Sequence, residues 1–162
     1  MRDYTAQPVP DSVWKNPYHF IAFGFGSGAV PFAPGTFGTL MAIPFYLAMQ
    51  PLSPILYLLL LIGITLASMW LCDKVSKETH SHDHSGMCLD EIVGYLVTMF
   101  AAPKGFIWIC IGFALFRFFD IVKPWPIDYV DMHVKGGVGM ILDDVLAGVY
   151  SLIIIHILAW IF

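Results

Sequence analysis

The sequence predicts an all-α, polytopic integral membrane protein with about five transmembrane helices. Of its 162 residues, 58% are hydrophobic and 12% are charged, whereas about 25% of the residues of a typical soluble protein are charged. Residues 54–72 and 145–162 are uncharged and long enough to cross a hydrocarbon core of about 30 Å. A glycine-rich stretch at residues 24–40, GFGSGAVPFAPGTFGTL, predicts a kinked or re-entrant segment before the first span.

Three shorter apolar segments complete the expected bundle. Residues 37–50 form one candidate span, which Pro44 is expected to kink. Residues 92–102 and 106–119 are typical of a helical hairpin with a turn at 103–105. The first arm is short, because about 11 residues cover only about 17 Å at 1.5 Å per residue. This arm must take residues from the preceding CLDE sequence, tilt, or cross only part of the membrane.

The chain is expected to hold one membrane domain at residues 17–162, preceded by an N-terminal cytoplasmic tail at residues 1–16. The tail contains acidic residues and prolines, so it does not resemble a signal peptide. No basic patch of the kind that nucleic-acid binding requires is present. The three cysteines show no CxxC spacing, and their odd number argues against a disulfide framework.

The charged residues indicate an orientation. If the N-terminus is cytoplasmic, seven of the eight basic residues lie on the inner side and only Lys104 lies outside, in agreement with the positive-inside rule. All twelve acidic residues also fall on the inner side. Longer inner loops would explain this clustering, but the positions of the acids suggest a further cause.

Two acidic doublets are predicted to open helices. Asp90 and Glu91 precede the third span, and Asp143 and Asp144 precede the fifth. Capping of the helix dipole is one explanation, worth about 0.3–1 kcal/mol for each acid. Two doublets brought together would repel each other unless a cation neutralised them. Oxygen ligands favour Mg²⁺, Mn²⁺ or Ca²⁺ over zinc.

The sequence FRFFDIVKPWP at residues 116–126 forms a third charged cluster. Arg117 and Asp120 are three residues apart and share a helix face. Either they form a structural ion pair while Lys123 reaches the interface, or Asp120 joins the metal site while Arg117 and Lys123 bind an anion. Two prolines, at positions 124 and 126, are expected to end the helix.

Two further motifs contain candidate polar groups. The sequence HSHDHSG at residues 80–86 contains His82, Asp83 and His84. Zinc ligation, proton transfer and an exposed polar loop are all open interpretations of these residues. The glycine-rich stretch lacks the GK[ST] of a Walker A loop. Close helix packing would explain its glycines, but a re-entrant turn would also offer backbone N–H groups to an anion, with hydroxyl groups from Ser27, Thr36 and Thr39.

These blocks together resemble the phosphatidylglycerophosphatase A family, from about Asn16 to the last helix. The sequences that carry the resemblance are GFGSGAVPFAPGTFGTL, HDHSGMCLDEIVG, FRFFDIVKPWPI and GGVGMILDDVLAG. It implies a multi-pass enzyme of the bacterial inner membrane that converts phosphatidylglycerophosphate to phosphatidylglycerol and phosphate, requires Mg²⁺ and faces the cytoplasm. It also implies functional roles for the acidic doublets, the HDH sequence, the Gly-Pro-Thr block and Arg117, Asp120, Lys123 and Asp131.

The expected site therefore contains metal ligands, phosphate ligands and a proton-transfer group. The metal ligands are Asp90, Glu91, Asp120, Asp143 and Asp144, and the residues that bind substrate are Ser27, Thr36, Thr39, Arg117 and Lys123. Asp83 or His84 would act as base or leaving-group acid, alongside Arg117 and Lys123 as catalytic residues. The attacking group is either a water activated by Mg²⁺, which we favour, or a carboxylate that forms a phosphoaspartate. A small transporter or ion channel with interfacial carboxylates is the alternative function.

Overall fold

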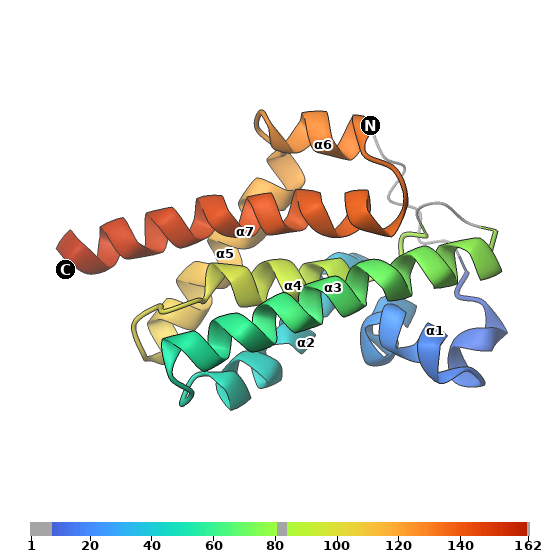
Figure 1. The fold of residues 1–162 in the computed structure, drawn as a ribbon, viewed down its shortest axis with the longest axis horizontal. Helices are drawn as coiled ribbons and strands as arrows, with labels where there is room; N and C mark the ends of the chain where they lie inside the picture. The colour runs from blue at the N-terminus through green and yellow to red at the C-terminus, as the bar shows by residue number, and fades with distance from the viewer. Residues whose placement is uncertain (1–7, 81–83, 162) are drawn as a thin grey trace.

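The computed structural model describes residues 8–80 and 84–161, and within these ranges the chain is 77% helix with no strand (Figure 1). This confirms the all-α class. The elements in chain order, where η denotes a 3-10 helix, are η1 (Asp11–Trp14), α1 (Pro17–Ala22), η2 (Gly24–Ala29), α2 (Pro34–Met49), α3 (Pro54–Glu78), α4 (Leu89–Thr98), α5 (Phe106–Val122), α6 (Ile127–His133) and α7 (Gly136–Ile161).

The short helix α4 lies at the centre of the molecule. It packs against α2, α3, α5 and α7, and every residue of α4 except Asp90 and Glu91 is buried. A helix that is apolar nearly all round is expected in such an internal position. Its ten residues cover about 15 Å, half the thickness of a hydrocarbon core. The expected third span is therefore a short internal helix, which takes its first residues from the CLDE sequence.

The predicted pair of helices is present, but its first arm, α4, ends at Thr98 instead of residue 102. The connection to α5 therefore covers residues 99–105 rather than 103–105. The helix α5 ends at Val122, directly before the Lys-Pro-Trp-Pro sequence, as expected from the prolines. Pro44 lies inside α2, and the kink expected there stays a prediction.

The helix α7 begins earlier than predicted. It starts at Gly136, so Asp143 and Asp144 lie about two turns inside the helix, and the prediction that they open it is wrong. The glycines before them allow a close helix contact. A Cβ atom on Gly137 would lie 2.1 Å from the Met69 carbonyl oxygen of α3. These glycines thus serve as a packing surface at the start of the helix.

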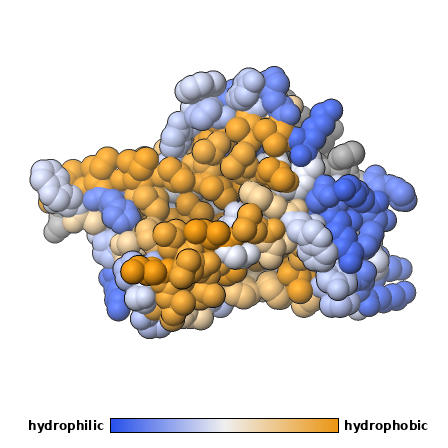
Figure 2. All heavy atoms as spheres, viewed as in Figure 1, coloured by the Kyte–Doolittle hydropathy of each residue, from blue (hydrophilic) through white to orange (hydrophobic). Residues whose placement is uncertain are grey.

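Two helices, α3 and α7, are long and apolar enough to cross a membrane. Large apolar side chains are exposed along both, including Ile55, Leu59, Leu66, Ile153 and Trp160. Figure 2 shows apolar residues across the middle of the molecule and hydrophilic residues gathered at its right-hand end, beside α1 and the end of α3. These features indicate membrane association, while the total of five spans stays a prediction.

The glycine-rich segment contains a backbone kink. Within η2, Phe25 and Gly26 adopt left-handed conformations, with φ of 58° and 87°. A Cβ atom on Gly28 would lie 1.8 Å from the Gly86 carbonyl oxygen, so this segment packs directly on the loop that precedes α4. Re-entry of the segment into a membrane stays a prediction. In the described part of the expected tail, Val13 is buried in the core.

Candidate functional site

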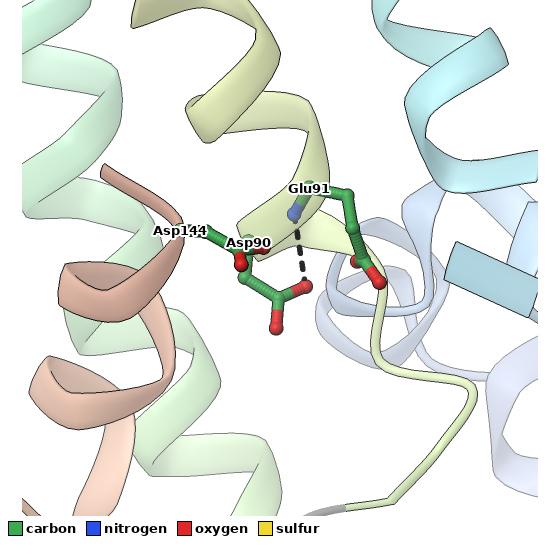
Figure 3. A group of neighbouring side chains, drawn as sticks. All are labelled: Asp90, Glu91 and Asp144. Atoms are coloured by element: carbon green, nitrogen blue, oxygen red, sulfur yellow. Dashed lines mark hydrogen bonds between the residues drawn. The ribbon is translucent and has the colours of Figure 1, made fainter. Parts of the chain in front are cut away.

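Three acidic side chains meet where the first turn of α4 lies beside α7. A carboxylate oxygen from each of Asp90, Glu91 and Asp144 lies within 4.8 Å of the others. Figure 3 draws these three side chains, two from α4 and one from α7. Asp90 also accepts a hydrogen bond of 3.0 Å from the Glu91 backbone N–H, drawn as the dashed line. The structure thus brings together one complete predicted doublet and one residue of the other.

The helix α5 contributes a basic and an acidic side chain to the same place. Arg117 Nη1 donates a hydrogen bond of 2.5 Å to Asp120 Oδ2 and lies 3.9 Å from Glu91 Oε1. Asp120 in turn interacts with the carboxylates of Glu91 and Asp144. The side chains of Arg117, Glu91 and Asp120 are only 13–15% exposed. We call Asp90, Glu91, Asp120 and Asp144 the acid cluster.

The N-terminus of α2 lies directly against these groups. A Cβ atom on Gly35 would come 2.3 Å from Glu91 Oε1 and 3.0 Å from Arg117 Nη1, so only glycine fits there without displacing a charged group. The N-cap residue of α2 is Ala33, and no side chain caps this end of the helix. Pro34 has no N–H, and the N–H groups of Thr36 and Phe37 donate to the Ala33 carbonyl oxygen. The Gly35 N–H is therefore the backbone donor that the first turn of α2 leaves beside Glu91 and Arg117.

Two buried polar atoms of the site have no hydrogen-bond partner among the described residues, Glu91 Oε2 and Arg117 Nε. Such atoms are rare in folded proteins because an unsatisfied buried polar group costs about 1–3 kcal/mol. A cation at Glu91 and an anion at Arg117 would satisfy both atoms. The site therefore has the character of a binding site for a cation and an anion together.

The donor set of the acid cluster fits a divalent cation that prefers oxygen. Two ligands of one Mg²⁺ lie at most about 4.2 Å apart, twice the bond length of about 2.1 Å. The separations of up to 4.8 Å between oxygens of Asp90, Glu91 and Asp144 are close to this limit, so small side-chain movements would complete the set. All three ligands are carboxylates, which suits Mg²⁺ better than zinc.

Burial raises the pKa values of the acids on α4. Burial is the main cause for Asp90, and the nearby charges of Glu91 and Asp144 add to the increase. Burial also raises the pKa of Glu91, and Arg117 partly opposes the increase. Both residues therefore favour a proton or a bound cation over a free negative charge.

Asp143 pairs with Lys123, whereas Asp144 lies beside Asp90 and Glu91. Lys123 Nζ donates a hydrogen bond to Asp143 and another, of 3.0 Å, to Asp131 on α6. Burial lowers the pKa of Lys123, but the charges and hydrogen bonds of Asp143 and Asp131 outweigh this effect and raise it. Lys123 thus joins the end of α5 to α6 and α7, at the edge of the acid cluster.

The other predicted site residues lie around the loop before α4 and along the glycine-rich segment. His84 is buried, accepts a hydrogen bond of 3.1 Å from the Gly86 N–H and contacts the Phe23 ring. His82 and Asp83 lie outside the described residues. The hydroxyl groups of Ser27 and Thr39 donate to backbone carbonyls, and Thr36 lies in the first turn of α2. Their proposed contacts with substrate stay predictions.

The sequence interpretation missed the close helix contact that aligns the two doublets. A Cβ atom on Gly94 of α4 would lie 2.7 Å from the Asp144 carbonyl oxygen, and one on Gly148 of α7 would lie 2.5 Å from the Gly94 carbonyl oxygen. Each glycine stands four residues after an acid, at Asp90 and Asp144. This equal spacing was the signal in the sequence that could have predicted which acid of each doublet meets the other.

Comparison with known proteins identifies related enzymes. The family model for phosphatidylglycerophosphatase A matches residues 20–159. The Escherichia coli phosphatidylglycerophosphatase A is 43% identical over 139 residues, which cover 85% of this chain and 80% of the relative. The Haemophilus influenzae phosphatidylglycerophosphatase A is 39% identical over 142 residues, which cover 86% of this chain and 87% of the relative.

A third relative has a different name. A Bacteroides thetaiotaomicron protein, proposed to be a phosphatidylinositol-3-phosphatase, is 42% identical over 149 residues, which cover 87% of this chain and 92% of the relative. No solved structure matches the chain.

Proposed function

This chain belongs to the phosphatidylglycerophosphatase A family and is a phosphatase, and we propose that it hydrolyses the terminal phosphate of phosphatidylglycerophosphate. The products are phosphatidylglycerol and inorganic phosphate. The reaction takes place at the cytoplasmic face of the bacterial inner membrane and requires Mg²⁺. The names of the two phosphatidylglycerophosphatase relatives support this substrate.

The structural observation that carries the proposal is the partnerless Glu91 Oε2 within the acid cluster. Asp90, Glu91 and Asp144 would hold Mg²⁺, with Asp120 beside them as a further carboxylate. When bound, Mg²⁺ would supply positive charge to the phosphate and acidify a water molecule for attack on phosphorus. Without a cation, these buried carboxylates repel one another.

Arg117 would bind the phosphate group. Its guanidinium keeps its Nε–H free while Nη1 is bonded to Asp120. The Gly35 backbone N–H, in the first turn of α2, adds a further donor on the same side. A helix N-terminus and an arginine together favour a dianionic phosphate and the charge that develops during its transfer.

Lys123 would act indirectly, although it was predicted to contact phosphate. Its hydrogen bonds to Asp131 and Asp143 hold α6 and α7 against the end of α5. We propose that this arrangement positions Asp120 and Asp144, the neighbouring members of the acid cluster. Asp143 is then a partner of Lys123 rather than a metal ligand.

The proton acceptor and donor would come from the loop before α4. His84 is buried in this loop, which continues directly into Asp90 and Glu91, and Asp83 precedes it in the sequence. Either residue would take the proton of the attacking water or return one to the glycerol oxygen that leaves. Attack by water, rather than by a carboxylate, leaves the acidic side chains free to bind the cation.

A transporter or ion channel is not favoured, because the two phosphatidylglycerophosphatase relatives are named as enzymes. The proposal is tested by measuring phosphate release from phosphatidylglycerophosphate with the purified full chain, in Mg²⁺ and in EDTA. We expect activity only with the divalent cation, and at least a 10²-fold loss in the Asp144→Asn variant, since this change removes a metal ligand. Activity that persists in EDTA would contradict the metal-dependent proposal.

The name of the third relative makes a substrate panel informative. Phosphatidylinositol 3-phosphate and phosphatidic acid should be compared with phosphatidylglycerophosphate at equal surface concentration. We expect phosphatidylglycerophosphate to give the highest kcat/KM. A higher kcat/KM for phosphatidylinositol 3-phosphate would agree with the proposed hydrolysis of a lipid phosphate but would identify phosphatidylinositol 3-phosphate as the preferred substrate.

A further inference from the structure

A cavity lies at the other end of α4 from the acid cluster. Its volume is about 290 Å³, and its walls come from the end of α2, the start of α3 and the loop between α4 and α5. Met99, in its wall, lies nine residues after Asp90, about 14 Å along the chain if the helical rise is maintained. The cavity is therefore separate from the proposed catalytic site, and its volume is near the lower end of the range for small-molecule sites.

The polar groups of the cavity can donate hydrogen bonds. Tyr46 is 1% exposed, and its hydroxyl oxygen accepts a hydrogen bond of 2.8 Å from Gln50 Nε2. That bond leaves the hydroxyl hydrogen of Tyr46 available, because this hydroxyl donates to no acceptor in the part of the chain that the structure describes. Lys104 contributes an ammonium group at the edge of the cavity.

The electrostatic environment of this cavity is positive. Lys104 is the only charged residue between Glu91 and Arg117, and no charged residue occurs between Lys15 and Asp73. The helices α3 and α5 both begin beside the cavity, and neither has an acidic residue in its first turn. The helices α2 and α4 end beside the cavity, so the helix dipoles largely offset one another and the positive charge at the cavity comes from Lys104.

The surface around the cavity is strongly apolar. Ile55 at the start of α3 is 75% exposed, and Phe106 and Ile107 at the start of α5 are 79% and 66% exposed. An occupant that combines an anionic group with hydrocarbon chains would match both the positive cavity and this apolar rim. A free anion would leave the apolar rim uncovered.

We propose that this cavity is a second, non-catalytic binding site for the phosphodiester headgroup of an anionic phospholipid. The phosphate accepts hydrogen bonds from Tyr46 and Lys104, and the acyl chains lie along the exposed apolar residues of α3 and α5. The site holds the loop after α4 against the α2–α3 connection, at the end of the helix that carries Asp90 and Glu91 in its first turn.

The test measures lipid binding by the purified full chain in a neutral detergent, using native mass spectrometry. The probe is dioctanoyl phosphatidylserine, an anionic phosphodiester that is neither substrate nor product of the proposed reaction. Dioctanoyl phosphatidylcholine and inorganic phosphate serve as the comparison ligands. We expect the anionic lipid to bind most tightly and inorganic phosphate not to displace it.

Two variants with matched controls locate the binding. Lys104→Ala should weaken phosphatidylserine binding about fivefold, which corresponds to about 1 kcal/mol for one lysine near an anionic lipid. Tyr46→Phe should weaken it about tenfold, since it removes a hydrogen bond to a charged group. Lys135→Ala and Tyr150→Phe remove the same groups elsewhere and should leave the affinity unchanged. Phosphate release should persist in Lys104→Ala, because Lys104 is remote from the acid cluster.

Three results would overturn the proposal. Equal lipid affinity in Lys104→Ala and Lys135→Ala would show that the cavity does not bind the headgroup. Equal binding of phosphatidylcholine would show that anionic charge is not recognised, and displacement by inorganic phosphate would identify a free anion as the ligand. Because Lys104 is exposed, its variant tests the proposal even if Tyr46→Phe alters folding.

Discussion

Gly94 and Gly148 pack backbone against backbone, and this contact determines how the two acidic doublets meet. Either glycine would place a Cβ atom within 3 Å of a backbone oxygen of the facing helix. Asp90 and Asp144 each stand one helical turn before their glycine, so the crossing of α4 and α7 brings these two carboxylates together. The close approach of Asp90 and Asp144, on which the proposed metal site rests, thus depends on two glycines that have no functional side chain.

Gly148→Ala is predicted to lower both stability and metal affinity. The added methyl group overpacks the crossing, at a cost of about 1–3 kcal/mol, and separates Asp144 from Asp90. Thermal melting and the Mg²⁺ concentration for half-maximal phosphate release measure the two effects. Gly63→Ala on α3 is the matched control, because nothing lies within 4 Å of its Cβ position, and it should stabilise the helix by about 0.5–1 kcal/mol. Similar changes in both variants would contradict this role of the crossing.

The sequence predicted the residue types of the site better than their pairing. Hydropathy and proline positions were sufficient for α3, for α5 and for the hairpin, because these features act locally. The start of α7 was missed, since its first turn is rich in glycine and the contact of Gly137 with α3 joins residues far apart in the sequence. The hydrogen-bond partner of Asp143 could not be predicted either. Lys123, at the end of α5, contacts Asp143 only in the folded chain, across 20 residues of sequence.

Arg117→Lys is predicted to reduce the rate of phosphate release about 10²-fold with little change in melting temperature. Lysine keeps the positive charge beside Asp120 but lacks the planar donor set of arginine, and a preorganised donor is worth about this factor. Asp120→Asn should instead weaken Mg²⁺ binding, and added Mg²⁺ should partly restore its rate. If both variants are fully active and only less stable, the pair is a structural ion pair.

Lys123→Met is predicted to destabilise the protein by about 3–5 kcal/mol, because it leaves Asp143 buried without its partner. The double variant Lys123→Met with Asp143→Asn should recover most of this loss, since it removes the unpaired charge as well. Thermal melting of the two single variants and the double variant measures their coupling. A Lys123→Met variant with normal melting and a strongly reduced kcat/KM would instead identify Lys123 as a phosphate ligand.

The orientation in the membrane is predicted from the basic residues. In a Cys110→Ser background, single cysteines at Ser53 and Lys104 should react with an impermeant thiol reagent from outside the cell. Cysteines at Ser85 and Asp131 should react only after the membrane is opened. Labelling at Ser85 from outside would contradict both the orientation and the cytoplasmic site.

The stability of the metal-free protein is predicted to fall as the pH rises. The folded pKa of Asp90 lies well above its ordinary value, mainly because of burial, while the unfolded pKa is about 3.9. Between these two values the folded state binds more protons than the unfolded state, so the free energy of unfolding decreases with increasing pH. Bound Mg²⁺ replaces the proton, and its stabilising effect should therefore increase over the same interval.

Melting temperatures in EDTA and in Mg²⁺ between pH 5 and pH 8 measure both effects. Asp90→Asn is the control, because its amide does not titrate. We expect the variant to show a weaker decrease of melting temperature with pH in EDTA and a smaller gain from Mg²⁺ at the higher pH. The same pH dependence in the variant and the natural chain would show that Asp90 is not the group responsible.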